Sequence, residues 1–237
     1  MIWPFTRSPR IELPDAEAMR LAALKAMPQV SPRTPLAELR WVVVDVETGG
    51  LNPQTDPLLS IGAVEIRNRQ ISLGTGFEAG LQQAAATSHE NILIHGLTHS
   101  QQLAGMAAKD ALLDFAEFAA GAPFVAFHAS FDRTALQVAM QKELGWNFPG
   151  RWLDAAVIAP LLFPDLAKAC RSLDDWLAAL SIQNYARHSA VADAAATAQL
   201  WLILLEAAGR QRIHTLKDLE ALAQARKWLG GLVISIF

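Results

Sequence analysis

The strongest hydrophobic pattern in this chain is the apolar run that begins at Trp41 and continues to Val46 across a single aspartate. A short run rich in β-branched residues predicts a buried strand. Segments 58–66 and 71–77 also have strand patterns, and only the polar turn 67–70 separates them. Consecutive strands with short connections predict an antiparallel meander.

Helical spacing of apolar residues dominates the second half of the chain. It predicts helices over 98–120, 131–144, 172–180 and 191–208, with a short buried strand at 124–127. A short apolar stretch around residues 152–153 leads into another helix. A meander followed by alternating helices and strands predicts an α/β fold with three layers and a mixed sheet.

The two ends of the chain differ from this central pattern. Residues 1–36 are punctuated by prolines and contain one helical stretch, 15–27. Residues 209–237 contain another, 216–228, which Gly230 and Gly231 are expected to end. We therefore divide the chain into a helical extension (1–36), a main domain (37–208) and a helical tail (209–237).

Composition and charge exclude several classes of protein. Of the 237 residues, 52% are apolar, so a large core is expected rather than disorder. The net charge of −3 does not fit a protein that coats duplex DNA, although it allows an enzyme that grips a strand end. We find neither a membrane-span pattern nor a secretion signal, and the single cysteine forms no internal disulfide. We expect a cytoplasmic protein without a membrane contact.

Candidate chemistry begins where the first strand ends. Asp45 and Glu47 are two residues apart, so they point to the same face of a strand. Asp132 follows another buried strand and opens a helix, and Asp193 lies near the start of the last long helix. Ligand sites of open α/β sheets lie at such strand ends. The alternative for the first pair alone is a surface strand end with solvated acids.

Four carboxylates in one cleft require cations. Oxygen ligands select hard ions, Mg²⁺ or Mn²⁺, and two such ions are a common device for displacement at phosphorus. A histidine with a pKa near neutrality can accept the proton of the attacking water. His188 is the best candidate because it lies in a polar segment just before the Asp193 helix.

These motifs resemble the DEDD superfamily of 3′–5′ exonucleases, in its histidine-bearing DEDDh branch and especially the proofreading ε subunits of bacterial DNA polymerase III. Residues 45–51 read Asp-Val-Glu-Thr-Gly-Gly-Leu, which is similar to the family's Asp-x-Glu-Thr-Thr-Gly-Leu. Residues 59–65 resemble the second strand, and residues 94–98 resemble a segment that usually contains His-Gly-Ile-Thr. His188 and Asp193 have the His-x4-Asp spacing of this branch.

The resemblance implies a ribonuclease H-like fold over about residues 39–206 and a role for each acid. Asp45 would bridge two Mg²⁺ or Mn²⁺ ions, while Glu47 and Asp193 would complete the ion on the nucleophile side. Asp132 would support the second ion, partly through water, and His188 would be the general base.

The resemblance also implies substrate contacts, at positions listed here together: Thr48, Gly49, Leu51, His95, His128 and Phe131. Leu51 would wedge against the last base, with core packing as the alternative, and Phe131 would anchor the helix beneath Asp132. Two positions depart from the family. Gly49 replaces a second threonine, and Phe127-His128 replaces His-Asn in the second motif.

Three functions follow as hypotheses. The first is a metal-dependent 3′–5′ exonuclease that releases nucleoside 5′-monophosphates from single-stranded DNA ends. The second is RNA 3′-end trimming, or cleavage of short oligonucleotides, at the same site. The third is a binding module that docks a polymerase or another protein through its termini.

Overall fold

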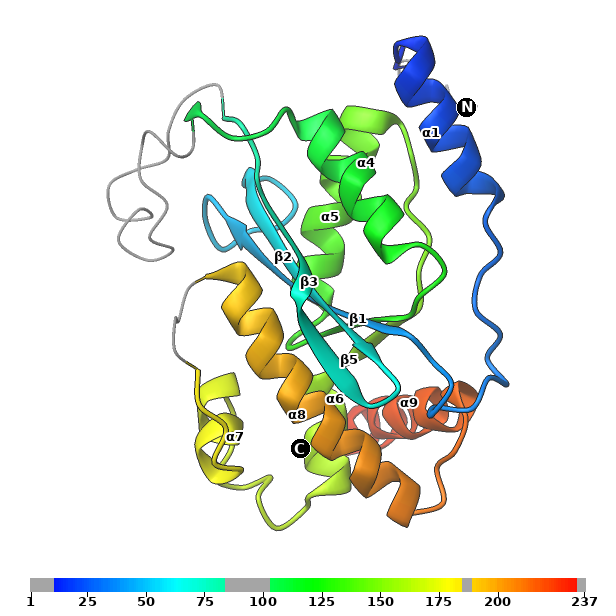
Figure 1. Cartoon of the computed structure of the whole chain (residues 1–237). Coiled ribbons are helices and arrows are strands. Elements are labelled where there is room, and N and C mark those ends of the chain that lie inside the picture. The colour runs from blue at the N-terminus through cyan, green and yellow to red at the C-terminus, as the bar shows by residue number, and fades with distance from the viewer. Residues whose placement is uncertain (1–10, 84–102, 185–188, 234–237) are drawn as a thin grey trace, which may run out of the picture.

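The structure, a computed structural model, describes residues 11–83, 103–184 and 189–233. Its centre is one five-stranded sheet in the order β3-β2-β1-β4-β5 (Figure 1). Strands β1, β2 and β3 form the antiparallel meander, and β4 and β5 continue the sheet in parallel with β1. The strands are β1 (Trp41–Thr48), β2 (Leu58–Arg67), β3 (Gln70–Gly80), β4 (Phe124–Ala126) and β5 (Trp152–Asp154). The mixed sheet predicted from the sequence is confirmed.

Helices cover both faces of this sheet. On one face, α4 (Ala108–Ala119) and α5 (Ser130–Leu144) pack together with α1 (Asp15–Ala26). The other face is covered by α6 (Ala155–Leu162), α7 (Leu173–Ala179), α8 (Ala190–Arg210) and α9 (Leu216–Val233). The three-layer α/β architecture expected from the sequence is therefore present.

The alternation of side chains along β1 connects the two cores. Val42 and Val44 are buried with α4 and α5, whereas Trp41 and Val43 are buried with α8. Trp41 packs edge to face on Trp201 of α8, with ring centroids 5.3 Å apart. Side chains two residues apart on a strand point to the same face. Asp45 and Glu47 follow Trp41 and Val43 in this alternation, so both acids point to the α8 face.

Two helix boundaries differ from the predictions. Within the described residues, the helix predicted for 98–120 is replaced by α4, which begins only at Ala108. The preceding Met106 joins the sheet edge instead, since its N–H donates to the carbonyl of Gly80 and its carbonyl accepts from the N–H of Gln82, both at 2.8 Å. Helix α9 continues to Val233 through both glycines that were expected to end it. Glycine disfavours a helix by only about 1 kcal/mol, which the surrounding chain can offset.

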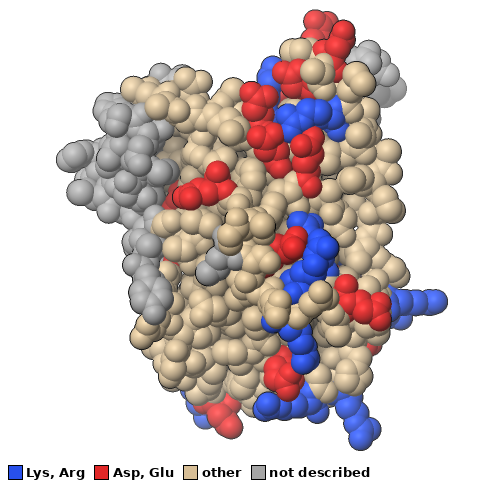
Figure 2. Space-filling view, viewed as in Figure 1, with Lys and Arg blue, Asp and Glu red and all other residues tan. Residues whose placement is uncertain are grey.

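The N-terminal extension packs on the main domain. Leu21 and Leu24 of α1 are buried in the same core as α4. Arg20 donates to Glu117 through Nε at 2.7 Å and also pairs with Asp114. Charges of both signs lie together at this end of the molecule (Figure 2). Helix α1 is thus held by apolar burial and by an ion-pair network.

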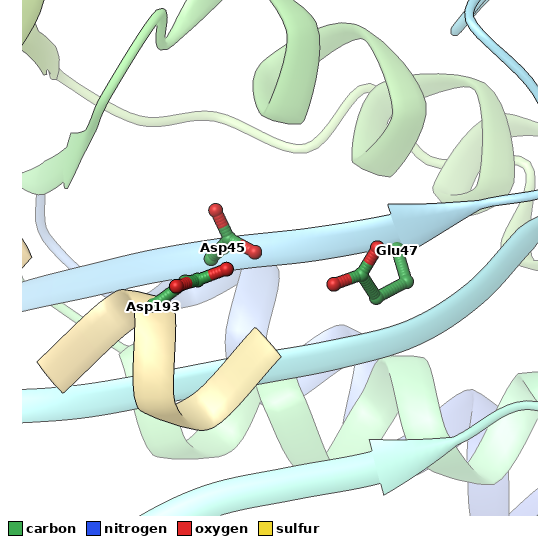
Figure 3. A group of neighbouring side chains, drawn as sticks. All are labelled: Asp45, Glu47 and Asp193. Carbon is green, nitrogen blue, oxygen red and sulfur yellow. The ribbon is translucent and has the colours of Figure 1, made fainter. Parts of the chain in front are cut away.

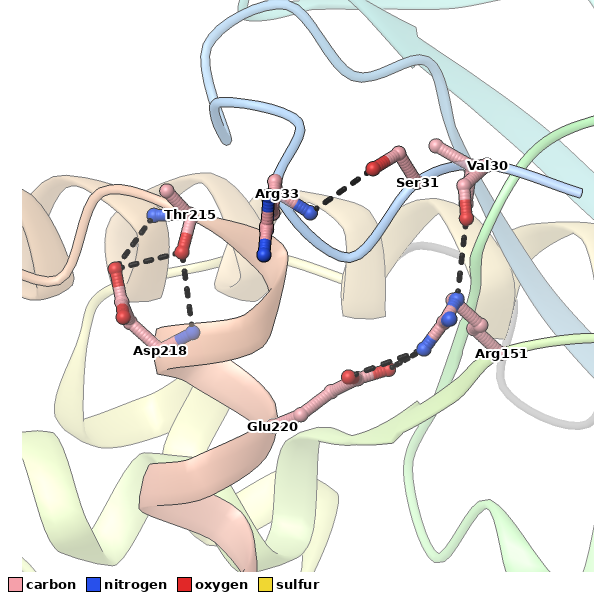
Figure 4. Close-up of polar contacts among 7 residues, drawn as sticks. All are labelled: Val30, Ser31, Arg33, Arg151, Thr215, Asp218 and Glu220. Atoms are coloured by element: carbon pink, nitrogen blue, oxygen red, sulfur yellow. Dashed lines mark hydrogen bonds and ion pairs between the residues drawn. The ribbon is translucent and has the colours of Figure 1, made fainter.

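The two extensions also meet each other. A β-bridge joins Pro35 to Thr215, and the N–H of Leu36 donates to the carbonyl of His214 at 2.8 Å. In the same region, Arg151 pairs with Glu220 of α9 at 2.9 Å and donates to the carbonyl of Val30 at 3.2 Å (Figure 4). These contacts fold both extensions against the main domain, and the division at residues 36 and 208 stays a prediction.

Helix α8 corrects one expectation from the sequence. By length and composition it is apolar enough to cross a membrane. However, 61% of its most apolar window is buried inside the structure, where it packs on β1 and β2. Core packing accounts for the apolar character of α8.

Candidate metal centre

Three carboxylates from two elements converge at the end of β1. Asp45 and Glu47 extend from the strand, and Asp193 extends from the first turn of α8 (Figure 3). One ligand oxygen from each residue lies within 4.8 Å of the others. Asp45 and Glu47 are half-buried and Asp193 is buried. The structure therefore brings together three of the four acids singled out in the sequence.

Asp132, the fourth acid, contacts the backbone of β1 between the two strand acids. It occupies the first turn of α5 and is only 4% exposed. Its Oδ1 accepts a hydrogen bond from the N–H of Val46, the residue between the two β1 acids, at 3.2 Å. Asp132 is thus anchored to the strand that carries Asp45 and Glu47, and its own metal contact stays a prediction.

Burial changes the protonation of Asp132. Loss of hydration raises its pKa from 3.8 to about 7, and the negative charge of Asp154 acts in the same direction. Backbone N–H donors, including that of Val46, oppose the rise. Without a cation, the protein therefore holds a carboxyl group that takes up a proton near neutrality, whereas a bound cation would favour its ionised form.

Asn184 is a contact that sequence reasoning missed. Its side-chain amide donates to Oδ1 of Asp193 and so orients that carboxylate. A hydrogen bond to a metal-binding carboxylate fixes the direction of its remaining lone pairs. The available signal was weak: Asn184 stands in the polar segment before α8, but a lone asparagine there is equally typical of a turn.

The turn after β1 is built by contacts within the chain. Thr48 donates through its hydroxyl to the carbonyl of Gly50 at 2.6 Å, and the N–H of Gly49 donates to the carbonyl of Pro57 at 2.8 Å. A Cβ at Gly50 would lie 2.3 Å from a carboxylate oxygen of Asp56, so a larger residue there would displace that side chain. At Gly50 this chain agrees with the family pattern.

Leu51 projects from this turn into solvent. Its exposed fraction is 93%, so the core-packing alternative is wrong. An exposed leucine beside an acidic cluster is available to contact a ligand.

His128, which stands where the family's second motif usually has asparagine, has a defined conformation. His128 is exposed and has a φ of 63°, a left-handed conformation in which histidine, like asparagine, is enriched. Its N–H donates to Oδ1 of Asp154 at 3.1 Å, and the same oxygen caps α6 by accepting from Ala156 at 3.0 Å. Phe131, in the first turn of α5, is half-buried against the core, as expected of an anchor. Two other candidates, His188 and His95, lie outside the described residues.

The arrangement of the three carboxylates is suited to binding a divalent cation. Three carboxylates at this separation repel one another unless a cation lies between them, and an all-oxygen ligand set selects hard divalent ions. The mixed sheet carries this acidic cluster at the end of β1, its central strand. The fold and the site thus define a class of protein: an α/β domain with a candidate site for hard divalent cations at the end of its central strand.

Comparison with known proteins identifies the family within this class. Residues 42–201 match the family model for exonucleases of the RNase T type, and the chain belongs to this family. A DNA polymerase III subunit epsilon-like protein from Rhodobacter capsulatus is 35% identical over 179 residues, which are 73% of this chain and 25% of that protein. A PolC-type DNA polymerase III from Thermotoga petrophila is 29% identical over 182 residues, which are 77% of this chain and 13% of that protein. The chain thus spans a quarter or less of the length of these relatives.

The fold has solved counterparts. The structure of exonuclease X in complex with 5′ overhanging duplex DNA superposes with a TM-score of 0.61 at 20% identity, and the match covers 77% of this chain and 99% of that one. At this level of identity the likeness supports the fold, and it confirms the ribonuclease H-like architecture expected from the sequence.

Proposed function

We propose that this chain is a 3′–5′ exonuclease that hydrolyses phosphodiester bonds at the 3′ ends of single-stranded DNA. The observation that carries the proposal is the convergence of Asp45, Glu47 and Asp193 within 4.8 Å in a chain of the exonuclease family. The products would be nucleoside 5′-monophosphates and a DNA strand shortened by one residue.

The acidic residues fit two Mg²⁺ or Mn²⁺ ions. Asp45, Glu47 and Asp193 would hold them together with Asp132, and the ions would supply Lewis acidity at the scissile phosphate. Asn184 orients the Asp193 carboxylate, and the Val46 N–H orients that of Asp132. The ligand set is thus partly preorganised by contacts that do not depend on the metal.

His188 takes the proton of the reaction in this proposal. A water oxygen attacks phosphorus, the bond from phosphorus to the 3′ oxygen breaks, and the departing 3′ oxygen takes a proton from solvent to become a hydroxyl group. A neutral imidazole can accept the proton lost by the water. The sequence supports this assignment, because four residues separate His188 from Asp193, as in the DEDDh branch.

The substrate end would be held by the turn after β1 and the start of α5. The exposed Leu51 offers an apolar contact for the terminal base, and the backbone of Thr48 and Gly49 lies beside the acids. His128, exposed at the α5 end, and His95 would contribute further contacts. The DNA-bound state of exonuclease X and the polymerase names of the relatives favour DNA over RNA as the substrate.

A protein partner and a cytoplasmic location complete the proposal. The names of the relatives point to a DNA polymerase as the partner, docked through the extensions 1–36 and 209–237. Lys217→Glu, on the exposed face of α9, should then weaken co-purification with that polymerase without removing a core side chain.

The decisive assay follows hydrolysis of single-stranded DNA and RNA of the same sequence, labelled at the 5′ end, with Mg²⁺, Mn²⁺ or EDTA. Stepwise loss of nucleotides from DNA, dependent on metal and abolished in Asp45→Asn, is expected. Glu206→Gln is a matched control, because Glu206 lies on α8 like Asp193 but pairs with Arg69 and Arg210 on the surface. Faster loss from RNA would assign the same site to RNA trimming. No hydrolysis of either strand with both metals would contradict the proposal.

A further inference from the structure

Gly62 stands at the contact between the sheet and the helix that carries Asp193. It lies on β2 directly opposite Asp45, so the missing side chain of Gly62 would face α8 as the Asp45 side chain does. A Cβ built at Gly62 would lie 2.1 Å from the backbone nitrogen of Val191 and 2.2 Å from the carbonyl carbon of Ala190. The first turn of α8 therefore packs directly against the backbone of β2, with no side chain between them.

The atoms in this contact belong to the backbone of α8, and this decides how a substitution would be absorbed. A flexible side chain could rotate away from an added methyl group, but the backbone of Ala190 and Val191 moves only if the helix start moves. Because real Cβ atoms almost never approach other atoms within 3.0 Å, the helix start would have to move by about 1 Å to relieve the contact.

That movement would reach the metal centre. Asp193 lies in the same helical turn, where its N–H donates to the carbonyl of Ser189 at 2.9 Å. Its carboxylate is one of three whose ligand atoms lie within 4.8 Å of one another, and the other two belong to β1. A shift of α8 away from the sheet separates Asp193 from Asp45 and Glu47. Mg²⁺ demands near-ideal ligand geometry, so such a shift weakens its binding.

We infer that Gly62 is a positioning residue, which sets the distance between Asp193 and the two β1 carboxylates by allowing α8 to approach the sheet at backbone contact. The inference rests on the proposed function only for its effect on catalysis, because its effect on metal binding is independent of the reaction. According to this inference, Gly62 determines how far apart the metal ligands lie. A substitution at Gly62 should therefore lower the affinity for metal although it removes no ligand.

The test compares Mn²⁺ binding, measured by electron paramagnetic resonance, in the wild type and in Gly62→Ala. We expect the Kd for Mn²⁺ to rise at least roughly tenfold, with kcat reduced up to about a hundredfold, because a misplacement of about 1 Å has effects of this size. Gly74→Ala is the matched control: Gly74 lies on the neighbouring strand β3, and its added Cβ meets nothing within 4 Å. Unchanged Mn²⁺ affinity in folded Gly62→Ala would overturn the inference.

A compensating substitution separates positioning from general damage. Asp193→Glu lengthens the carboxylate arm by one methylene group, so it should weaken Mn²⁺ binding in the wild type but partly restore it in Gly62→Ala. If Gly62→Ala does not fold, the same comparison is made in a Ser189→Gly background, which adds backbone freedom at the N-cap residue of α8. Equal Mn²⁺ affinity of Ser189→Gly with and without the Gly62 change would also overturn the inference. If the wild type binds Mn²⁺ but hydrolyses no nucleic acid, the proposed function fails while the role of Gly62 is still decided by binding.

Discussion

Replacing Asp132 by asparagine should stabilise the metal-free protein at alkaline pH. Asp132 is buried, and its pKa is raised from 3.8 to about 7, chiefly by lost hydration. A carboxyl group with a raised pKa in the folded state contributes stability below its unfolded pKa, and this contribution is lost as the pH rises through the folded pKa. Asparagine has nearly the same shape, keeps an oxygen that can accept from Val46, and carries no charge.

The size of the effect follows from the shift in pKa. A shift of about 3 units corresponds to about 4 kcal/mol of unfolding free energy once the pH exceeds both pKa values. About 3 kcal/mol of this develops between pH 5 and 8. For a chain of this length, the difference in Tm between the wild type and Asp132→Asn should therefore grow by roughly 6–12 °C between pH 5 and pH 8.

The assay is thermal or urea-induced unfolding in EDTA from pH 5 to 8. Asp175→Asn is a control of opposite sign: hydrogen bonds from the backbone of Ser172 and Arg171 lower the pKa of Asp175, so its stabilising effect is lost only in more acidic solution. The difference in unfolding free energy between Asp175→Asn and the wild type should therefore be constant from pH 5 to 8. In excess Mg²⁺ the order should reverse for Asp132, because asparagine is a poorer ligand than a carboxylate. A constant difference between Asp132→Asn and the wild type from pH 5 to 8 would refute the argument from burial.

Three further predictions concern the surface of the molecule. Leu51→Ala should change the unfolding free energy by less than about 0.5 kcal/mol, since the side chain is 93% exposed, but should raise the KM for single-stranded DNA by roughly tenfold; an unchanged KM would remove Leu51 from the substrate site. Arg20→Ala should cost about 1 kcal/mol in urea unfolding by breaking the pairs with Asp114 and Glu117, and a loss that does not shrink in high salt would contradict an ionic origin. His128→Val should lower the unfolding free energy by about 1–3 kcal/mol because a β-branched residue tolerates a φ of 63° poorly, whereas His128→Asn should not; equal losses would exclude this cause.

The sequence predicted what local periodicity determines. The strand period of two placed Asp45 and Glu47 on one face, and the start of the last long helix placed Asp193 near them. The capping box that the structure has at Ser172 and Asp175 is a feature of the same local kind, because its residues are three apart. These features depend on neighbours in the chain, so a pattern of residues is enough to predict them.

Contacts between distant segments were not predictable in this way. Asn184 bonds to Asp193, Asp56 fills the space beside Gly50, and Gly62 admits the start of α8 only once the sheet and the helices have packed. The same reason explains the late start of α4, because the pairing of Met106 with the sheet edge removes its segment from the helix. In each case a tertiary partner decides the conformation, and the local sequence is compatible with more than one.

The bridge between Pro35 and Thr215 has a consequence for how such a unit can be used in larger proteins. It brings the points where the chain enters and leaves the central domain side by side, at the opposite end of β1 from the carboxylates. A domain with adjacent entry and exit points can be inserted into a surface loop of a host without forcing the ends of that loop apart. The geometry therefore makes this domain portable: a host could carry it as an insertion, with the acidic cluster at the end of β1 facing away from the junction.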